Sequence, residues 1–381
     1  MNFEELLSNL NENVFLKEFT FSKNFFTPPN ESEYELADNL IFLENFIFIY
    51  QCKERRSNSN VINNNVEKRW FESKILKKAT RQIRDTISYF KRYSPIRLKN
   101  HRGHEFKINL DNKKVFKIIS YDNQNLPIDC MRVNYHKSKH VGFIHILPID
   151  NYFNVINTLY TPYEISEYFK FREKIILNNL SKDYFVDEIS LLGQYLSGRL
   201  EDKPSKNYIK YFVCFKNDLG EFNLNPLLLK FGDRIYGPSG DNKDYYSILT
   251  EFSKLNRAYL KQIKGRVDCC LEKLFKDEII IPTRVYNPET CCGFVVMTLP
   301  NSMIKGKRQY LENTTIAAKY ELNYKKEIGI LFVKDGNDII IDWCLIIGPN
   351  KKNETLETIL KENNPFREVD IKKISRYNFN Q

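Results

Sequence analysis

Two short apolar runs near the N-terminus predict a β-hairpin. Residues 40–43 and 46–50 are rich in Ile, Leu and Phe, and a polar pair separates them. Asp38 precedes the first run, and Gln51 and Lys53 close the second. Because the chain turns back between the two strands, these three polar side chains should meet at one end of the hairpin. Gln51 and Lys53 should also share a face of the sheet, since side chains two apart on a strand point the same way.

A pattern with a helical period begins at Val66. Apolar residues recur there at steps of three or four, which predicts one long helix over residues 66–92. The stripe consists of Phe71, Ile75, Ala79, Ile83, Thr86 and Phe90. Gln82 lies at the edge of this stripe, so it is either a side chain directed at the sheet or an ordinary polar residue at the boundary of the buried face.

Strand and helix patterns alternate through the rest of the chain. Strands are expected at 115–120, 130–136, 141–149, 208–215, 278–282 and 292–300, and helices at 151–176 (two of them), 245–275 and 304–326. Asp335 and Gly336 separate two apolar runs, which predicts a second hairpin. The predicted fold class is α/β. A mixed sheet flanked by helices should form from residues 1–178, and an α/β or α+β domain from residues 179–381.

The positive charge is concentrated just after the predicted hairpin. The net charge is +10, which on its own fits either an anionic partner or the lysine-rich composition of the chain. Residues 66–107 contain 13 Lys and Arg against four Asp and Glu, an excess of +9. This clustering favours nucleic acid, because basic side chains that neutralise phosphates bind a backbone irrespective of its sequence. The residues expected to contact phosphates are Lys74, Lys77, Lys78, Arg81 and Arg84.

The polar end of the predicted hairpin has the chemistry of a divalent-cation site. Asp38 offers a carboxylate, and the Gln51 side chain and the Cys52 carbonyl add further oxygens. Mg²⁺ prefers hard oxygen ligands and retains several waters for contact with substrate phosphates. Lys53 would orient or activate a water molecule and stabilise the charge that develops on a phosphate.

The phrase E-L-x-D, followed by two apolar strands and Q-x-K, resembles the PD-(D/E)XK nuclease superfamily. Glu35, Asp38, Gln51 and Lys53 carry the phrase here, and the resemblance covers the N-terminal part of the chain best. It implies a restriction-endonuclease-like fold and Mg²⁺ or Mn²⁺ as the cofactor. Gln51 replaces the usual second acid, as in a variant of the family, and this removes one negative charge from the expected metal site.

The resemblance also implies roles for individual residues. The implied metal ligands are Glu35, Asp38, Gln51 and Cys52, and the implied catalytic residues are Glu35, Asp38, Gln51, Lys53 and Gln82. Lys78, one helical turn before Gln82, is a further candidate to support the site from the long helix.

The identity of the acid that joins Asp38 stays open between Glu31, Glu33 and Glu35. The E-L-x-D phrase favours Glu35. If residues 35–38 are helical, the two carboxylates share a face. If these residues are extended, the carboxylates point to opposite faces.

The chain shows no sign of export or membrane insertion. Residues 2–14 form an acidic amphipathic segment rather than a signal peptide, and no apolar run reaches membrane-spanning length. The eight cysteines are therefore expected to be reduced thiols in a cytoplasmic protein.

These patterns predict a metal-dependent endonuclease that hydrolyses nucleic-acid phosphodiester bonds, with DNA favoured over RNA. By resemblance, the expected setting is a bacterial restriction or antiviral defence system, with a homodimer or a partner protein. The alternative is a catalytically inactive nucleic-acid-binding or scaffold subunit with a nuclease-like fold. The C-terminal domain is expected to serve assembly, sensing or partner docking.

Overall fold

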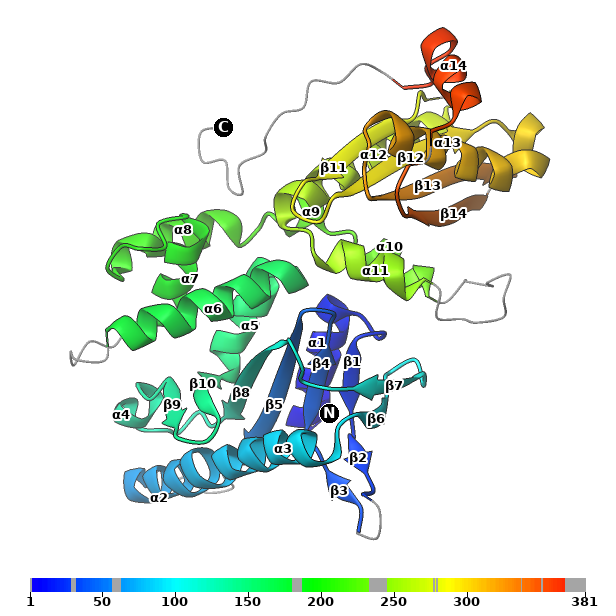
Figure 1. Ribbon diagram of the computed structural model, residues 1–381. Helices are drawn as coiled ribbons and strands as arrows, with labels where there is room; N and C mark the ends of the chain where they lie inside the picture. Colours follow the sequence, from blue (N-terminus) through cyan, green and yellow to red (C-terminus); the bar gives the residue numbers. More distant parts are fainter. Residues whose placement is uncertain are drawn as a thin grey trace. The chain divides into compact units, whose positions relative to one another are not determined.

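A computed structural model of the chain describes residues 2–28, 32–56, 63–179, 187–232, 245–276, 278, 280–336, 338–350 and 352–366 (Figure 1). The chain divides into two units, each with its own sheet. The first comprises Met1–Asn217 with Asn225–Arg234, and the second comprises Asp218–Leu224 with Ile235–Gln381. The predicted α/β class is confirmed, with a helix-flanked mixed sheet followed by a second sheet-containing domain.

The sheet of the first unit has six strands in the order β1-β4-β5-β8-β10-β9. These strands are β1 (Thr20–Ser22), β4 (Asn39–Phe42), β5 (Phe46–Glu54), β8 (Lys114–Asp122), β10 (Gly142–Pro148) and β9 (Tyr135–Ser138). Strand β4 is antiparallel to β1 and β5, whereas β5, β8 and β10 are parallel to one another. The predicted N-terminal hairpin is therefore β4–β5. The start of β4 lies at the same edge of the sheet as the end of β5.

One long helix covers one face of this sheet, as predicted (Figure 1). It consists of α2 (Asn64–Trp70), the π-helical segment η1 (Phe71–Ala79) and α3 (Thr80–Tyr93), which follow one another directly. All six residues of the predicted stripe are buried. The first three steps of the stripe are four residues long, which exceeds an α-helical turn of about 3.6 residues. The wider turn of the π-helix keeps these residues on the sheet face, because its hydrogen bonds reach the fifth residue along the chain.

Three helices cover the opposite face, namely α1 (Phe3–Phe15), α5 (Ile149–Leu159) and α6 (Pro162–Asn178). Phe48 of β5 contacts Phe15 of α1 and Phe169 of α6, with ring centroids 5.4 and 5.7 Å apart. Its neighbours Ile47 and Ile49 pack beneath the long helix instead. Because side chains alternate along a strand, Gln51 and Lys53 fall on the side of the long helix.

The first unit continues past residue 178, the end that the sequence predicts. Arg172 of α6 donates to both oxygens of Glu188, the first residue of α7 (Glu188–Leu196), over distances of 2.8–3.0 Å. Both side chains are buried, and Tyr168 also donates to Glu188 at 2.5 Å. This contact ties α7 to the first unit.

The predicted strand 208–215 is wrong. These residues form the end of the 3₁₀ helix η2 (Lys206–Tyr208) and α8 (Ile209–Phe215). Tyr208 and Phe212 are buried, whereas Val213 is 61% exposed. Burial therefore recurs with a helical period, and only one side of the segment packs against the rest of the unit.

The predicted strand 130–136 is also wrong over most of its length. The helical turn α4 (Ile128–Met131) occupies its beginning, and β9 starts only at Tyr135. Cys130 and Val133, three residues apart, pack into the core beneath the long helix, which is a helical rather than an extended spacing.

The second unit contains a four-stranded sheet in the order β11-β12-β13-β14. Its strands are β11 (Thr283–Asn287), β12 (Cys292–Leu299), β13 (Lys326–Asp335) and β14 (Asp338–Ile347), and its long helices are α12 (Arg257–Phe275) and α13 (Lys307–Glu321). The predicted hairpin at Asp335-Gly336 is confirmed as β13–β14, in which Asp335 pairs with Asp338.

Two predictions for the second unit are wrong. The expected helix 245–275 is divided into α11 (Tyr246–Ser253) and α12, because the Asn256 side chain caps α12 by accepting from the N–H groups of Ala258 and Tyr259. The expected strand 278–282 is absent from the described residues of that stretch, and β11 begins only at Thr283.

Within the part of the chain that the structure describes, no helix combines the length and the apolar character needed to cross a membrane.

Candidate active site

Asp38, Gln51 and Lys53 converge at the edge of the first sheet. Lys53 Nζ lies 3.4 Å from Asp38 Oδ2, 3.3 Å from Gln51 Oε1 and 2.6 Å from the Cys52 carbonyl oxygen. The Asp38 carboxylate also accepts a hydrogen bond from the Cys52 N–H, at 2.6 Å. Asp38 is 8% exposed and Gln51 is 2% exposed. Three oxygens of different kinds therefore surround one ammonium group in a sheltered position.

A buried polar network holds the start of β4 next to Asp38. Asn39 accepts a hydrogen bond from Asn11 of α1 at 2.7 Å and donates one to Ser8 at 3.2 Å. Asn11 in turn accepts from the Tyr152 hydroxyl of α5 at 2.6 Å. All four side chains are buried. Satisfied buried networks favour one geometry, so this network fixes α1 against the strand that carries Asp38.

Glu35 reaches the site from an extended segment. It lies in β3 (Tyr34–Glu35), which pairs with β2 (Phe25–Phe26), so the extended alternative describes this residue. Desolvation raises the pKa of Glu35, and the charge of Asp38 raises it further, whereas Lys53 and Lys78 lower it. The charges of Asp38 and Lys53 therefore act on Glu35, which is exposed and forms no hydrogen bond or ion pair with either of them in the described structure.

The other two acids considered from the sequence are less well placed. Glu33 is exposed, as Glu35 is, and within the described residues it forms no hydrogen bond or ion pair with Asp38 or Lys53. Glu31 lies outside the described residues.

The charges of Asp38 and Lys53 also act on Glu4, an exposed acid that the sequence patterns do not single out. It lies in the first turn of α1. Its pKa is raised, first by desolvation and then by the charge of Asp38, with Lys53 acting in the opposite direction and Glu35 adding to the rise. Like-charged carboxyl groups held close together are typical of functional sites. An acid in a helical first turn gives no signal of this role until α1 is packed onto the sheet.

The long helix is anchored beside the same residues. The Thr86 hydroxyl donates a hydrogen bond to the carbonyl oxygen of Leu36, which stands between Glu35 and Asp38 in the chain. Gln82 lies one turn before Thr86, and its side-chain oxygen is buried without a hydrogen-bond partner among the described residues. A buried acceptor without a partner is unusual in a folded protein, and its burial keeps it out of reach of a substrate in this conformation.

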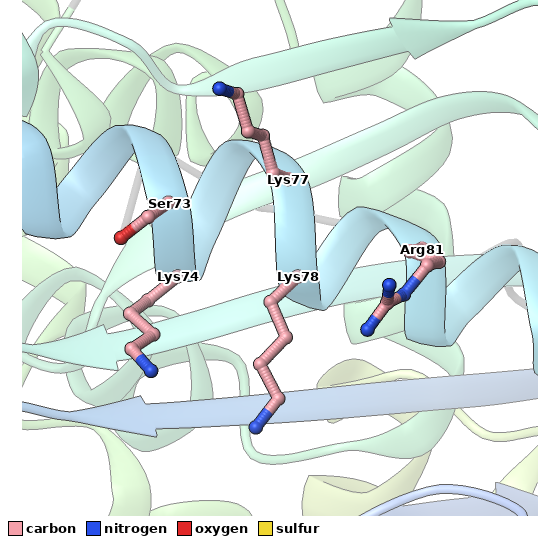
Figure 2. A pocket seen from close by; sticks show the side chains of 5 residues that line it. All are labelled: Ser73, Lys74, Lys77, Lys78 and Arg81. Carbon is pink, nitrogen blue, oxygen red and sulfur yellow. The ribbon is translucent and has the colours of Figure 1, made fainter.

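The outer side of the helix is basic (Figure 2). Ser73, Lys74, Lys77, Lys78 and Arg81 line a surface hollow of about 320 Å³. In the view of Figure 2, Lys74 and Lys78 extend to the same side of the helix and Lys77 to the opposite side. All five residues predicted to contact phosphates are exposed. Arg84 lies 3.7 Å from the Asp85 carboxylate, and the other four form no ion pair within the described part of the chain.

No protein-family model, curated protein or solved structure matches the chain. Any functional assignment therefore depends on the residues described above.

The donor set at the hairpin end fits a hard divalent cation. Its oxygens come from a carboxylate, an amide and a backbone carbonyl, and all three already converge on a positive group. Among the described residues, no three His, Cys, Asp or Glu side chains are grouped closely enough to hold a metal by themselves. Lys53 Nζ lies 2.6–3.4 Å from these oxygens, so an ion held by them and by water would require the ammonium group to move aside.

Proposed function

We propose that this chain is a metal-dependent nuclease that hydrolyses phosphodiester bonds in nucleic acid, with DNA as the favoured substrate. The observation that supports this proposal most strongly is the convergence of Asp38, Gln51 and the Cys52 carbonyl on Lys53. The long helix of the same unit carries exposed basic side chains on its outer side, and most of them form no ion pair within the described residues. A phosphate-binding surface next to an oxygen-rich cation site is the combination that phosphodiester hydrolysis requires.

Each residue of the site has its own role in the proposed reaction. Asp38, Gln51 and the Cys52 carbonyl would hold Mg²⁺ or Mn²⁺, and the ion, when bound, supplies a Lewis acid for the phosphate oxygens. Lys53 orients the attacking water and stabilises negative charge on the phosphate. Glu4 and Glu35 add negative charge near the cation site, and Lys78 positions the substrate backbone from the helix.

Cleavage assays on plasmid DNA and on RNA test this proposal. In the presence of Mg²⁺, Asp38→Ala and Lys53→Ala should each lower the cleavage rate by about 100-fold or more, the usual scale for loss of a catalytic acid, base or ion ligand. Both variants should still bind the substrate. Lys113→Ala is the matched control, because Lys113 bonds to the Glu44 carbonyl at the turn end of the hairpin and should not affect cleavage.

Equal cleavage by the wild type, Asp38→Ala and Lys53→Ala would overturn the assignment. Binding without any cleavage by the wild type would favour a catalytically inactive nucleic-acid-binding subunit instead. Far-ultraviolet circular dichroism of each variant separates a lost reaction from a lost fold.

A further inference from the structure

A second basic wall lies opposite the long helix. The turn between β9 and β10 and the helix together line a groove of about 500 Å³. The helix contributes Leu76, Lys77, Thr80, Arg81 and Arg84, and the end of β9 with the turn after it contributes His136, Lys137, Ser138, Lys139 and His140. Among the described residues, no Asp or Glu lines this groove. The sequence K-S-K-H of the turn lies outside the segment whose charge stood out in the sequence.

The turn is held in a defined conformation. Ser138 Oγ accepts hydrogen bonds from the N–H groups of His140 and Val141, at 3.3 and 3.4 Å. At the base of the turn, Tyr135 of β9 stacks on Phe143 of β10 with ring centroids 5.4 Å apart. Lys137 and Lys139 are exposed beyond this base. The charges of the turn are therefore presented from a fixed support, which reduces the entropy lost on binding a ligand.

The groove is continuous with the hollow on the helix. Lys77 and Arg81 line both of them. Lys78, in the hollow, also acts on the pKa of Glu35 at the candidate active site. A row of basic side chains therefore runs from the β9–β10 turn across the helix.

We propose that this groove binds one phosphodiester strand of a nucleic acid. The inference rests on the proposed function and extends it, because it names a contact surface on the β9–β10 turn. A sugar–phosphate backbone fits the evidence because it carries regularly spaced negative charges, and the groove offers Lys and Arg on both walls without an intervening acid. An acidic polypeptide is the competing ligand, and the experiment includes it.

Binding is measured by fluorescence anisotropy in EDTA, so that it does not depend on cleavage. Labelled single-stranded DNA, duplex DNA and RNA are the three ligands, and polyglutamate of equal charge is the comparison. Lys137→Ala/Lys139→Ala should weaken nucleic-acid binding about tenfold or more at 0.1 M salt, since two phosphate contacts are lost. The slope of log affinity against log salt should fall by about one for each contact. The variant Lys77→Ala/Arg81→Ala should show the same loss of affinity and the same change in the salt slope.

The matched control is Lys170→Ala/Lys174→Ala. These two lysines are exposed on α6, which covers the opposite face of the same sheet, so the net charge changes equally without touching the groove. The control should bind as the wild type does. Lys137→Gln/Lys139→Gln repeats the test with long polar side chains, and thermal melting verifies the fold of each variant.

If neither Lys137→Ala/Lys139→Ala nor Lys137→Gln/Lys139→Gln weakens nucleic-acid binding, the proposed role of the groove is wrong. Polyglutamate that binds as tightly as nucleic acid, or more tightly, would also contradict it. The proposed function would survive either result if cleavage still depends on Asp38 and Lys53. Conversely, a wild type that binds through the turn but does not cleave would support the groove and reject the nuclease. The ligand whose affinity depends most on Lys137 and Lys139 identifies the type of strand.

Discussion

Hydrogen bonds to strand β5 and, through Asn39, to helix α1 hold Asp38 in position. Its own carboxylate accepts from the Cys52 N–H, and its neighbour Asn39 is bonded to Asn11 and Ser8 of α1. The hairpin pattern was sufficient to bring Asp38, Gln51 and Lys53 together, since strand pairing alone places them at one end. The pattern contained no information about Asn39, whose role depends on a helix distant in the sequence.

Glu327 is a buried carboxyl group that the structure reveals and the sequence pattern does not. It is 0% exposed at the start of β13, and neither carboxylate oxygen has a hydrogen-bond partner among the described residues. It fits above Gly293, where an added Cβ would lie 1.9 Å from Glu327 Oε2. Desolvation raises its pKa well above the ordinary value, despite the opposing charges of Arg284 and Lys319.

Glu327→Gln should therefore stabilise the second unit. A carboxyl group whose pKa is raised on folding imposes no penalty below the unfolded pKa of about 4.5, and the penalty grows with pH until the folded pKa is reached. At pH 7 the variant should have a higher free energy of unfolding than the wild type, because the neutral amide avoids the cost of burying a carboxylate. Urea denaturation at several pH values measures this gain, which should vanish near pH 4.5. A variant less stable than wild type at pH 8 would show that Glu327 is paired.

Among the elements, α6 and α7 are joined by a fully buried ion pair. Arg172 donates to Glu188, to the Asn134 carbonyl at 3.0 Å and to His145 Nδ1 at 3.0 Å. The acceptor role of Nδ1 requires a neutral ring, and burial lowers the pKa of His145, with the charge of Arg172 lowering it further. The network is satisfied at each of these atoms, so removing one partner leaves a buried charge uncompensated.

Glu188→Ala should destabilise the first unit by about 3–5 kcal/mol, the cost of breaking one side of a buried pair. Replacing both partners, in Arg172→Met/Glu188→Leu, should cost less than the single change, because no charge is then left unpaired. Chemical denaturation of the three proteins measures both quantities. A double variant less stable than Glu188→Ala would contradict this account of the pair.

A helix or a strand could be predicted where its sequence pattern was compatible with only one kind of element. The stripe of the long helix and the β13–β14 hairpin follow directly from their periods and turn residues. The strand prediction for residues 208–215 is wrong because the aromatic residues at 208, 211, 212 and 215 follow a helical spacing, and the segment packs on one side as a helix does. The division between α11 and α12 depends on Asn256, whose capping role was hidden within a continuous apolar pattern.

For the molecule as a whole, the proposed site and the buried Glu327 belong to different units, each with its own sheet. The proposed site, the basic helix and the groove belong to the first unit, and Glu327 belongs to the second. The fold class could be predicted because it depends on the alternation of strands and helices. The extent of the first unit could not, because it is set by the Arg172–Glu188 contact across a segment without a clear pattern.

Stability effects in the two units should therefore add. Residues that share no contacts usually give additive changes, within about 0.5 kcal/mol. The combined variant Glu188→Ala/Glu327→Gln should show the sum of the two single changes in urea denaturation at pH 7. A deviation of more than about 1 kcal/mol would show that the two cores are energetically coupled.

The oxygens at the end of the β4–β5 hairpin are proposed to hold a divalent cation. Electron paramagnetic resonance of Mn²⁺ tests this directly, because the signal of the free ion disappears on binding. Titration of the wild type should reveal a site that Asp38→Asn removes and Glu4→Gln weakens by about tenfold, the usual scale for a group outside the ligand set. Identical titration curves for the wild type and Asp38→Asn would contradict the account.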